Sequence, residues 1–146
     1  MKRCYLVRHA QTAWNFENRL QGHADLPLST IGEQQADRLS ACFASRYLQG
    51  LFTSALRRSL QTAQRIASGN GHRLTPVVEP ELAEMHLGAW EGLTPEEIDA
   101  RFGGAYGQWR QSPSSVMIPG AESHEAFRQR VRRVWGKLIA GLSEGE

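Results

Sequence analysis

Apolar runs and helical patterns alternate along the first half of the chain, and this alternation constrains the fold more than any other feature. A short apolar run at Cys4–Val7 is typical of a buried strand, and it ends in a charged pair. Amphipathic helices are predicted over about 30–45 and 56–67, and further short strands over 48–53 and 74–78. The order strand–helix–strand–helix–strand predicts an α/β fold with a mostly parallel sheet.

The second half of the chain is predicted to be helical, with one long loop. Thr94-Pro95-Glu96-Glu97 has the residues of a helix start: a Thr cap, proline in the first position and glutamate in the third. A Pro- and Ser-rich loop at 112–120 precedes a long amphipathic helix at 122–142. In an alternating α/β chain, a strand should begin in the residues that follow, Ser143–Glu146.

Three short strands make a small sheet for a chain of 146 residues, because parallel strands need cover on both faces. We therefore expect a three-layer α/β/α sandwich formed by a single domain, residues 1–146, that is incomplete at its C-terminus. The run at Cys4–Val7 would then present an unpaired apolar edge, which favours aggregation.

Composition places the chain among ordinary globular proteins, with 40% hydrophobic and 22% charged residues. No apolar run approaches the roughly 18–20 residues that span a bilayer. The apolar part of the N-terminus is also shorter than the roughly 7–15 residues of a signal peptide. We expect a cytoplasmic protein without a membrane partner.

Charge and cysteine spacing exclude two further classes of function. The net charge is only +2, and the basic cluster Arg128–Arg133 is expected to be a solvated helix face, so no nucleic-acid partner is predicted. Cys4 and Cys42 match no metal or redox spacing and are expected to be buried free thiols in a reducing cytoplasm. The oligomeric state cannot be read from the sequence.

Arg8 and His9 follow directly after the first predicted strand. Ligands bind beyond the carboxyl ends of strands in open parallel sheets, so this pair is a candidate anion site with a nucleophile or a base. Taken alone the signal is weak, because a single histidine at a strand end is more often structural.

The residues after His9 form an ordered series of motifs. They are Gln11, Thr12, Trp14 and Asn15, then Arg19, Gln21 and Gly22, then Asp25-Leu26-Pro27-Leu28-Ser29, then Gly32, Gln35 and Ala36, then Thr53-Ser54-Ala55-Leu56-Arg57-Arg58-Ser59-Leu60-Gln61-Thr62-Ala63, then Glu84, Gly88 and Trp90-Glu91-Gly92, and finally Pro119-Gly120-Ala121-Glu122-Ser123 and Arg130-Val131. The series resembles the histidine phosphatase superfamily, which includes phosphoglycerate mutases and alpha-ribazole phosphatases, and the resemblance covers nearly the whole chain.

The resemblance implies a role for four residues in catalysis. His9 matches the nucleophile that forms phosphohistidine, and Arg8 and Arg58 match arginines that hold the phosphoryl oxygens. Glu84 matches the general acid and base. Phosphoryl transfer depends mainly on positioning and charge stabilisation, and arginine forks fit phosphate oxygens, so these residue types suit the chemistry.

The resemblance also implies loop residues that bind the substrate: Asn15, Gln21 and Gly22 match positions that contact phosphate or the rest of a small phosphorylated substrate. Because the arginines supply the positive charge, no metal and no cofactor are expected.

Two departures from the family pattern stand out. Ala10 and Gln11 replace the usual Gly-Glu that follows the nucleophile. If position 10 required a positive φ, alanine there would cost about 1 kcal/mol. The second departure is the absence of the second catalytic histidine. The remaining histidines offer no convincing substitute; they are His23, His72, His86 and His124.

The function predicted on this basis is metal-independent hydrolysis of a phosphomonoester. About 30 residues separate Gly92 from Glu122. The family's mutases usually have more residues there, which cover the site, so the short stretch favours hydrolysis over the mutase reaction. A phosphoglycerate mutase is the first alternative. The second is an inactive fragment or a non-catalytic module that binds a phosphate ligand.

Overall fold

The computed structural model describes residues 3–141 of the chain. Its helices and strands, in chain order, are α1 Ala13–Phe16, α2 Thr30–Phe43, β1 Leu51–Thr53, α3 Arg57–Gly69, β2 Pro76–Val78, the 3-10 turns η1 Pro80–Leu82 and η2 Gly88–Trp90, α4 Pro95–Arg101, α5 Ala105–Gln111, η3 Pro113–Ser115 and α6 His124–Gly141. β1 and β2 are parallel, with Phe52 opposite Val77. The predicted α/β fold class is confirmed.

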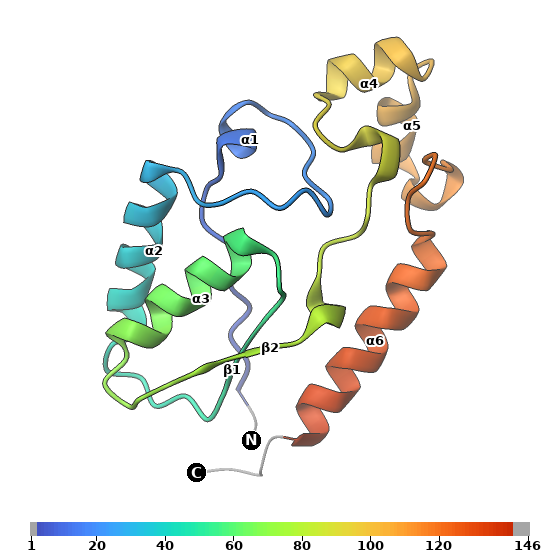
Figure 1. The fold of residues 1–146 in the computed structure, drawn as a ribbon. Coiled ribbons are helices and arrows are strands. Elements are labelled where there is room, and N and C mark those ends of the chain that lie inside the picture. The colour runs from blue at the N-terminus through green and yellow to red at the C-terminus, as the bar shows by residue number, and fades with distance from the viewer. Residues whose placement is uncertain (1–2, 142–146) are drawn as a thin grey trace.

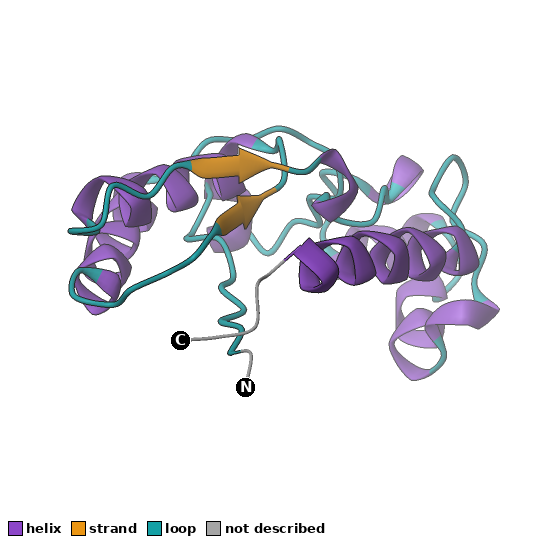
Figure 2. Ribbon diagram, turned by 90° about the horizontal axis from the view of Figure 1, so that it is seen from below, coloured by secondary structure: helices purple, strands orange, loops and turns teal. Residues whose placement is uncertain are grey.

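Helices lie on both sides of the two strands. α2 packs against α3, and α3 contacts β1 and β2. α6 lies on the other side of the strands, where it contacts η1 (Figures 1 and 2). The parallel direction follows from the topology, because α3 carries the chain back from the end of β1 to the start of β2.

The helix starts are set by side chains that cap free backbone N–H groups. The Ser29 hydroxyl accepts a hydrogen bond of 3.0 Å from Gly32 at the start of α2. At α4 the Thr94 hydroxyl accepts from the Glu97 N–H, and the Glu97 carboxylate accepts from the Thr94 N–H. The helix start predicted at Thr94-Pro95 is therefore confirmed.

The remaining predicted elements are present with somewhat different bounds, and α3 extends two residues beyond the predicted position 67. β1 and β2 are shorter than the strands predicted at 48–53 and 74–78. α6 begins two residues after the predicted position 122. The strand expected near Ser143–Glu146 lies outside the described residues, and the single domain over 1–146 stays a prediction.

The strand predicted at Cys4–Val7 is wrong: within the described residues this segment pairs with no strand. In Figure 1 it passes behind β1 and β2. A strand is buried only where neighbours pair with its backbone and cover its faces. The backbone hydrogen bonds of the sheet join β1 to β2 and do not include residues 4–7. Leu6 is consequently 85% exposed.

Both cysteines are free and exposed, so the prediction of buried thiols is also wrong. Cys4 belongs to the unpaired segment. Cys42 lies on α2, whose buried face passes through Ala36, Ser40 and Phe43, and position 42 lies off that face.

Two separate clusters of buried apolar residues hold the molecule together. The larger centres on Trp90 and on Ile98 of α4, which are 1% and 0% exposed, and the side chains of Tyr106 and Trp109 of α5 pack against it. The smaller consists of Ala10, Leu28 and Ala36. Because Ala10 follows His9 directly, this small cluster fixes the backbone at the candidate nucleophile.

Candidate active site

His9 is half-buried, and its ring is held in one tautomer. Its Nδ1 lies 2.7 Å from the carbonyl oxygen of Ala10. A carbonyl oxygen can only accept a hydrogen bond, so Nδ1 carries the hydrogen and Nε2 keeps its lone pair. Burial lowers the pKa of His9, and the positive charges of Arg58 and Arg8 lower it further. His9 is therefore a neutral imidazole at neutral pH, with Nε2 free to act as a nucleophile.

The backbone beside His9 is held by α2 and α3. The Ala10 N–H donates to the Thr62 hydroxyl at 3.1 Å, and that hydroxyl donates to the Arg58 carbonyl at 2.7 Å. Gly32 lies so close that a Cβ there would be 2.0 Å from the Gln11 carbonyl oxygen. Ala10 is not among the residues with positive φ. Its replacement of the family's glycine therefore adds no backbone strain.

Arg58 is buried at the start of α3, with 2% of its surface exposed. Its Nη1 donates to the Ala24 carbonyl at 2.8 Å and its Nη2 to the Gly22 carbonyl at 2.7 Å. Its Nε is buried and has no partner among the described residues. Burial lowers the pKa of Arg58, while nearby carboxylates, Glu84 first, oppose this change. A buried guanidinium with an unused donor is suited to binding an anion.

Arg8 and His9 line an open hollow of about 350 Å³. Three neutral amide side chains complete its lining: Gln11, Asn15 and Gln35. The Oε1 of Gln35 accepts a hydrogen bond of 3.0 Å from the Gln11 N–H. Gln35 comes from α2, one turn after Gly32, and the motif series implies no role for it. Its position on the same helix face as Gly32 was the available signal.

The three residues predicted to bind substrate each contact other parts of the protein. The Oδ1 of Asn15 accepts from the Thr12 N–H at 2.9 Å, and the Oε1 of Gln21 accepts from the Thr12 hydroxyl at 2.9 Å. Gly22 has φ +50° and lies against Glu91, so no side chain fits there. Of the three, Asn15 lines the hollow beside His9, and Gln21 and Gly22 build the loop that holds Arg58.

Glu84 is exposed and follows the turn after β2. Its Oε1 accepts from the Met85 N–H at 2.8 Å, and its carbonyl oxygen lies 2.7 Å from the Nε2 of His23. The carboxylate raises the pKa of His9, opposite to the effect of the arginines. Arg8, Arg58 and Glu84 all lie near enough to His9 for their charges to act on its pKa, but of the three only Arg8 lines the hollow together with His9.

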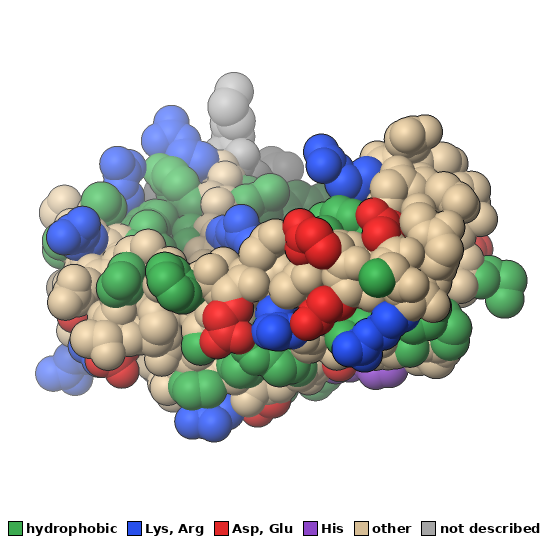
Figure 3. Space-filling model, turned by 90° about the horizontal axis from the view of Figure 1, so that it is seen from above, with side chains coloured by type: hydrophobic (Ala, Val, Ile, Leu, Met, Phe, Trp, Pro, Cys, Tyr) green, Lys and Arg blue, Asp and Glu red, His purple; other side chains and the backbone are tan. Residues whose placement is uncertain are grey.

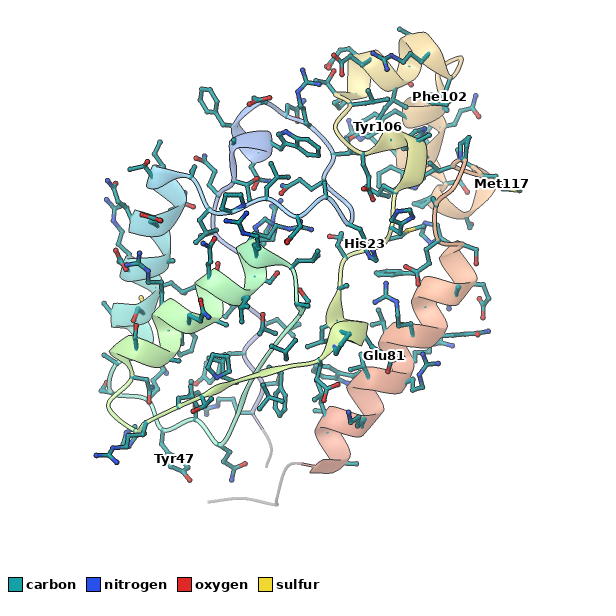
Figure 4. The ribbon with its side chains drawn as sticks, viewed as in Figure 1. His23, Tyr47, Glu81, Phe102, Tyr106 and Met117 are labelled. Carbon is teal, nitrogen blue, oxygen red and sulfur yellow. The ribbon has the colours of Figure 1, made fainter. Side chains whose placement is uncertain are left out.

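The other histidines fall into different parts of the molecule. His23 packs edge-on against His86, with ring centroids 5.0 Å apart, beside Glu84. His72 packs against Tyr47, which Figure 4 labels at the lower edge of the molecule, away from His23 near the centre. His23 is next to the site because it contacts the Glu84 carbonyl, and Glu91 is linked to it because Glu91 Oε1 accepts a hydrogen bond of 2.8 Å from the His23 N–H.

Surface charge and metal-binding groups add little to the site. On the face shown in Figure 3, basic and acidic side chains are interspersed. Within residues 3–141, no cluster of His, Cys, Asp and Glu could hold a metal ion. In the same part of the chain, no helix combines the length and the apolar character needed to cross a bilayer.

The fold and the assembled side chains define an α/β protein in which a neutral histidine lies among the charged side chains of Arg8, Arg58 and Glu84. The family model of the histidine phosphatase superfamily (branch 1) matches residues 4–146. The chain belongs to this superfamily.

Two curated relatives and one solved structure illustrate the similarity. A glucosyl-3-phosphoglycerate phosphatase of Mycobacterium tuberculosis is 35% identical over 144 residues, which cover 98% of this chain and 63% of that protein. The probable phosphoglycerate mutase GpmB of Yersinia enterocolitica is 35% identical over 141 residues, 90% of this chain and 60% of that protein. The structure of a mycobacterial glucosyl-3-phosphoglycerate phosphatase in complex with VO3 superposes with a TM-score of 0.83 at 34% identity. The match covers 93% of this chain and 66% of that chain. The chain thus spans about two thirds or less of each.

Proposed function

We propose that the protein hydrolyses a small phosphorylated metabolite through a phosphohistidine intermediate, without a metal ion or cofactor. The observation that carries this proposal is the tautomer of His9: Nδ1 donates to the Ala10 carbonyl and leaves Nε2 unprotonated beside two arginines. A neutral imidazole with a free lone pair is a competent nucleophile at neutral pH.

In the proposed reaction, His9 Nε2 attacks phosphorus in line and the bond to the leaving oxygen breaks. Arg8 and Arg58 stabilise the equatorial oxygens. The Glu84 carboxyl group gives its proton to the leaving alkoxide. Water then attacks the phosphohistidine, Glu84 takes up a proton from that water, and inorganic phosphate leaves with His9 neutral again.

The lining of the hollow favours hydrolysis over transfer to a second substrate. Its residues come from the N-terminal segment, α1 and α2, and none comes from 93–121. α4 and α5, which occupy much of that stretch, contribute side chains that pack around Trp90 instead. Water can therefore reach His9. The relative named as a phosphoglycerate mutase keeps mutase activity as the second candidate function, and a non-catalytic phosphate-binding module is the third.

The first test is hydrolysis of p-nitrophenyl phosphate by the full-length protein in the presence of EDTA, compared with its His9→Ala variant. We expect release of p-nitrophenol that survives chelation and is lost in the variant. Equal activity in both proteins would refute a role for His9. Activity abolished by EDTA and restored by a divalent cation would refute metal independence.

A second measurement distinguishes hydrolysis from the mutase reaction, in which the phosphoryl group moves to another oxygen of the substrate. The full-length protein is incubated with 3-phosphoglycerate, and both inorganic phosphate and 2-phosphoglycerate are followed. Phosphate release faster than isomer formation is the expected result. The reverse order would favour the mutase.

We propose a cytoplasmic location and a small phosphorylated substrate as the partner. Two free, exposed cysteines support the location, because such thiols persist in a reducing compartment. A net charge of +2 offers little attraction for nucleic acid.

A further inference from the structure

Arg130, on α6, donates hydrogen bonds to backbone carbonyls on the way to Glu84. Its Nη1 lies 2.6 Å from the carbonyl oxygen of Glu81 and 2.9 Å from that of Ala83, and its Nη2 lies 3.4 Å from that of Glu84. The side chain is 15% exposed, and its guanidinium lies over the Phe127 ring at 5.2 Å. A single planar group thus reaches the carbonyls that lead up to the proposed general acid.

Glu122 completes this arrangement from the other side of Glu84. Its carboxylate accepts from Arg130 Nε at 2.9 Å and from Nη2 at 2.7 Å, which is a bidentate pair. Its backbone N–H donates to the His86 carbonyl at 3.0 Å. The hydrogen bond from Arg130 lowers the pKa of Glu122, so both partners stay charged. The pair therefore holds the chain before and after Glu84.

The direction of the Glu84 side chain depends on this backbone. Its carboxylate is tied to the next residue, through the Met85 N–H, and its carbonyl oxygen also meets His23. Figure 4 shows Glu81 alongside α6 and His23 near the centre of the molecule. A shift of the segment from 81 to 84 would therefore move the carboxyl group with respect to His9.

Two other basic residues of α6 contact the same stretch in a different way. Arg133 pairs with the Glu81 carboxylate, and Lys137 pairs with Glu79, and each basic side chain is 64% exposed. They bind side chains rather than the carbonyls beside Glu84, and solvent screens them. They provide matched controls on the same helix.

We propose that Arg130, held by Glu122, is a positioning residue that sets the place of the Glu84 carboxyl group, and that it acts on the protonation of the leaving group. This inference rests on the proposed function. Arg130 does not touch the reacting atoms. Its effect should appear in the step that needs a proton and should be small in a step that does not.

The test compares two aryl phosphates in the full-length protein. Phenyl phosphate has a leaving group with a pKa of about 10 and needs protonation, whereas 2,4-dinitrophenyl phosphate leaves without it. For Arg130→Met we expect kcat/KM to fall about tenfold to a hundredfold with phenyl phosphate and less than about threefold with 2,4-dinitrophenyl phosphate. Arg130→Lys should show the same pattern more weakly, and Arg133→Gln should match the wild type on both substrates.

A double variant shows whether the effect passes through Glu84. Glu84→Gln alone should give the same dependence on the leaving group, and Arg130→Met should lower kcat/KM little further when added to it. A protein damaged only in its folding would lose activity with both substrates in proportion. Such a uniform loss, or additive losses in the double variant, overturns the proposal. A wild-type protein that hydrolyses neither substrate refutes the proposed function instead.

Discussion

The N-terminal segment Arg3–Val7 and the aromatic lobe around Trp90 are both rich in large apolar side chains, yet they differ in burial. Leu6 is 85% exposed, while Trp90 is 1% exposed. The lobe is formed by α4, α5 and the turns around them, whose rings pack on Trp90 at centroid distances of 6.1–6.3 Å. The N-terminal segment, which leads directly to the candidate nucleophile, pairs with no strand within the described residues.

This contrast shows that stability and the proposed chemistry lie in different parts of the molecule. The aromatic lobe contributes no residue to the hollow beside His9. The N-terminal segment leads directly to Arg8 and His9, which do line the hollow, but it adds little buried apolar surface of its own. Substitutions in the lobe should therefore change the free energy of unfolding, and substitutions near the segment should change association or protonation.

The largest expected effect is that of Trp90→Ala. Removing a fully buried tryptophan should lower the free energy of unfolding by about 3–5 kcal/mol. The control is Trp135→Ala, because the Trp135 side chain lies on α6 and is 42% exposed. Urea unfolding of the full-length protein, followed by circular dichroism, measures both. Equal losses in the two variants would contradict the distinction between the lobe and the surface.

The helices were predictable because their signals are local. Ser29, Thr94 and Pro95 mark helix starts by their chemistry, and apolar spacing identified α2, α3 and α6. The exposure of Cys4–Val7 and its lack of strand pairing were not predictable in this way. Apolar residues indicate that a segment can be buried, but burial depends on partners from elsewhere in the chain, which no local pattern contains.

The candidate site shows the same limit. The motif series gave His9, Arg8, Arg58 and Glu84 as neighbours, and the charges of the other three do act on the pKa of His9. It did not indicate that Arg58 is buried, because the carbonyls that hold it belong to residues 34 and 36 positions earlier. Nor did it assign a role to Arg130, whose contacts span 46–49 positions.

The second expected effect concerns self-association through the N-terminal segment. Residues 1–146 expressed alone should associate or precipitate, because an unpaired apolar segment invites pairing between copies. Leu6→Lys should weaken that association about tenfold to a hundredfold, which corresponds to about 1.5–3 kcal/mol for the burial of one leucine. Sedimentation equilibrium measures the change. Met117→Lys is the control, since Met117 is 96% exposed on another part of the surface (Figure 4).

An equal improvement from both lysine variants would mean that general surface hydrophobicity, and not the segment, causes association. A monodisperse wild-type monomer of residues 1–146 would contradict the prediction altogether. It would also weaken the contrast between the N-terminal segment and the aromatic lobe, because the exposed segment would then not cause self-association.

A smaller effect is expected at the start of α4, which carries the buried Ile98 into the aromatic lobe. Thr94→Ala removes the hydroxyl that accepts from the Glu97 N–H at 3.2 Å. The free energy of unfolding should fall by about 1 kcal/mol. Thr30→Ala, at an exposed first position of α2 where Ser29 is the cap, should change it by less than half as much. Thermal unfolding of the two variants compares them directly.

The smallest expected effect is electrostatic and lies beside the N-terminal segment. The pKa of His9 is lowered by burial first, then by Arg58 and Arg8. Arg8→Gln removes one cation, so the pKa of His9 should rise, and Arg38→Gln on the exposed side of α2 should leave it unchanged. Arg8 is exposed and its charge is screened by solvent, which keeps the shift small. Nitrogen NMR of the imidazole ring reports this pKa and the tautomer directly.

The same shift has a consequence for activity and for stability. Only neutral His9 attacks phosphorus, so the acidic limb of kcat/KM should lie below pH 6.5, the ordinary value for histidine, and should move to higher pH in Arg8→Gln. Ionisation of the substrate affects both proteins equally and cancels in the comparison. The unfolded chain binds the His9 proton first, so as the pH falls below about 6.5 the folded state loses stability. Arg8→Gln should reduce that loss, because it brings the folded pKa closer to the unfolded one. A limb that moves to lower pH would mean that Arg8 does not act on His9 through its charge.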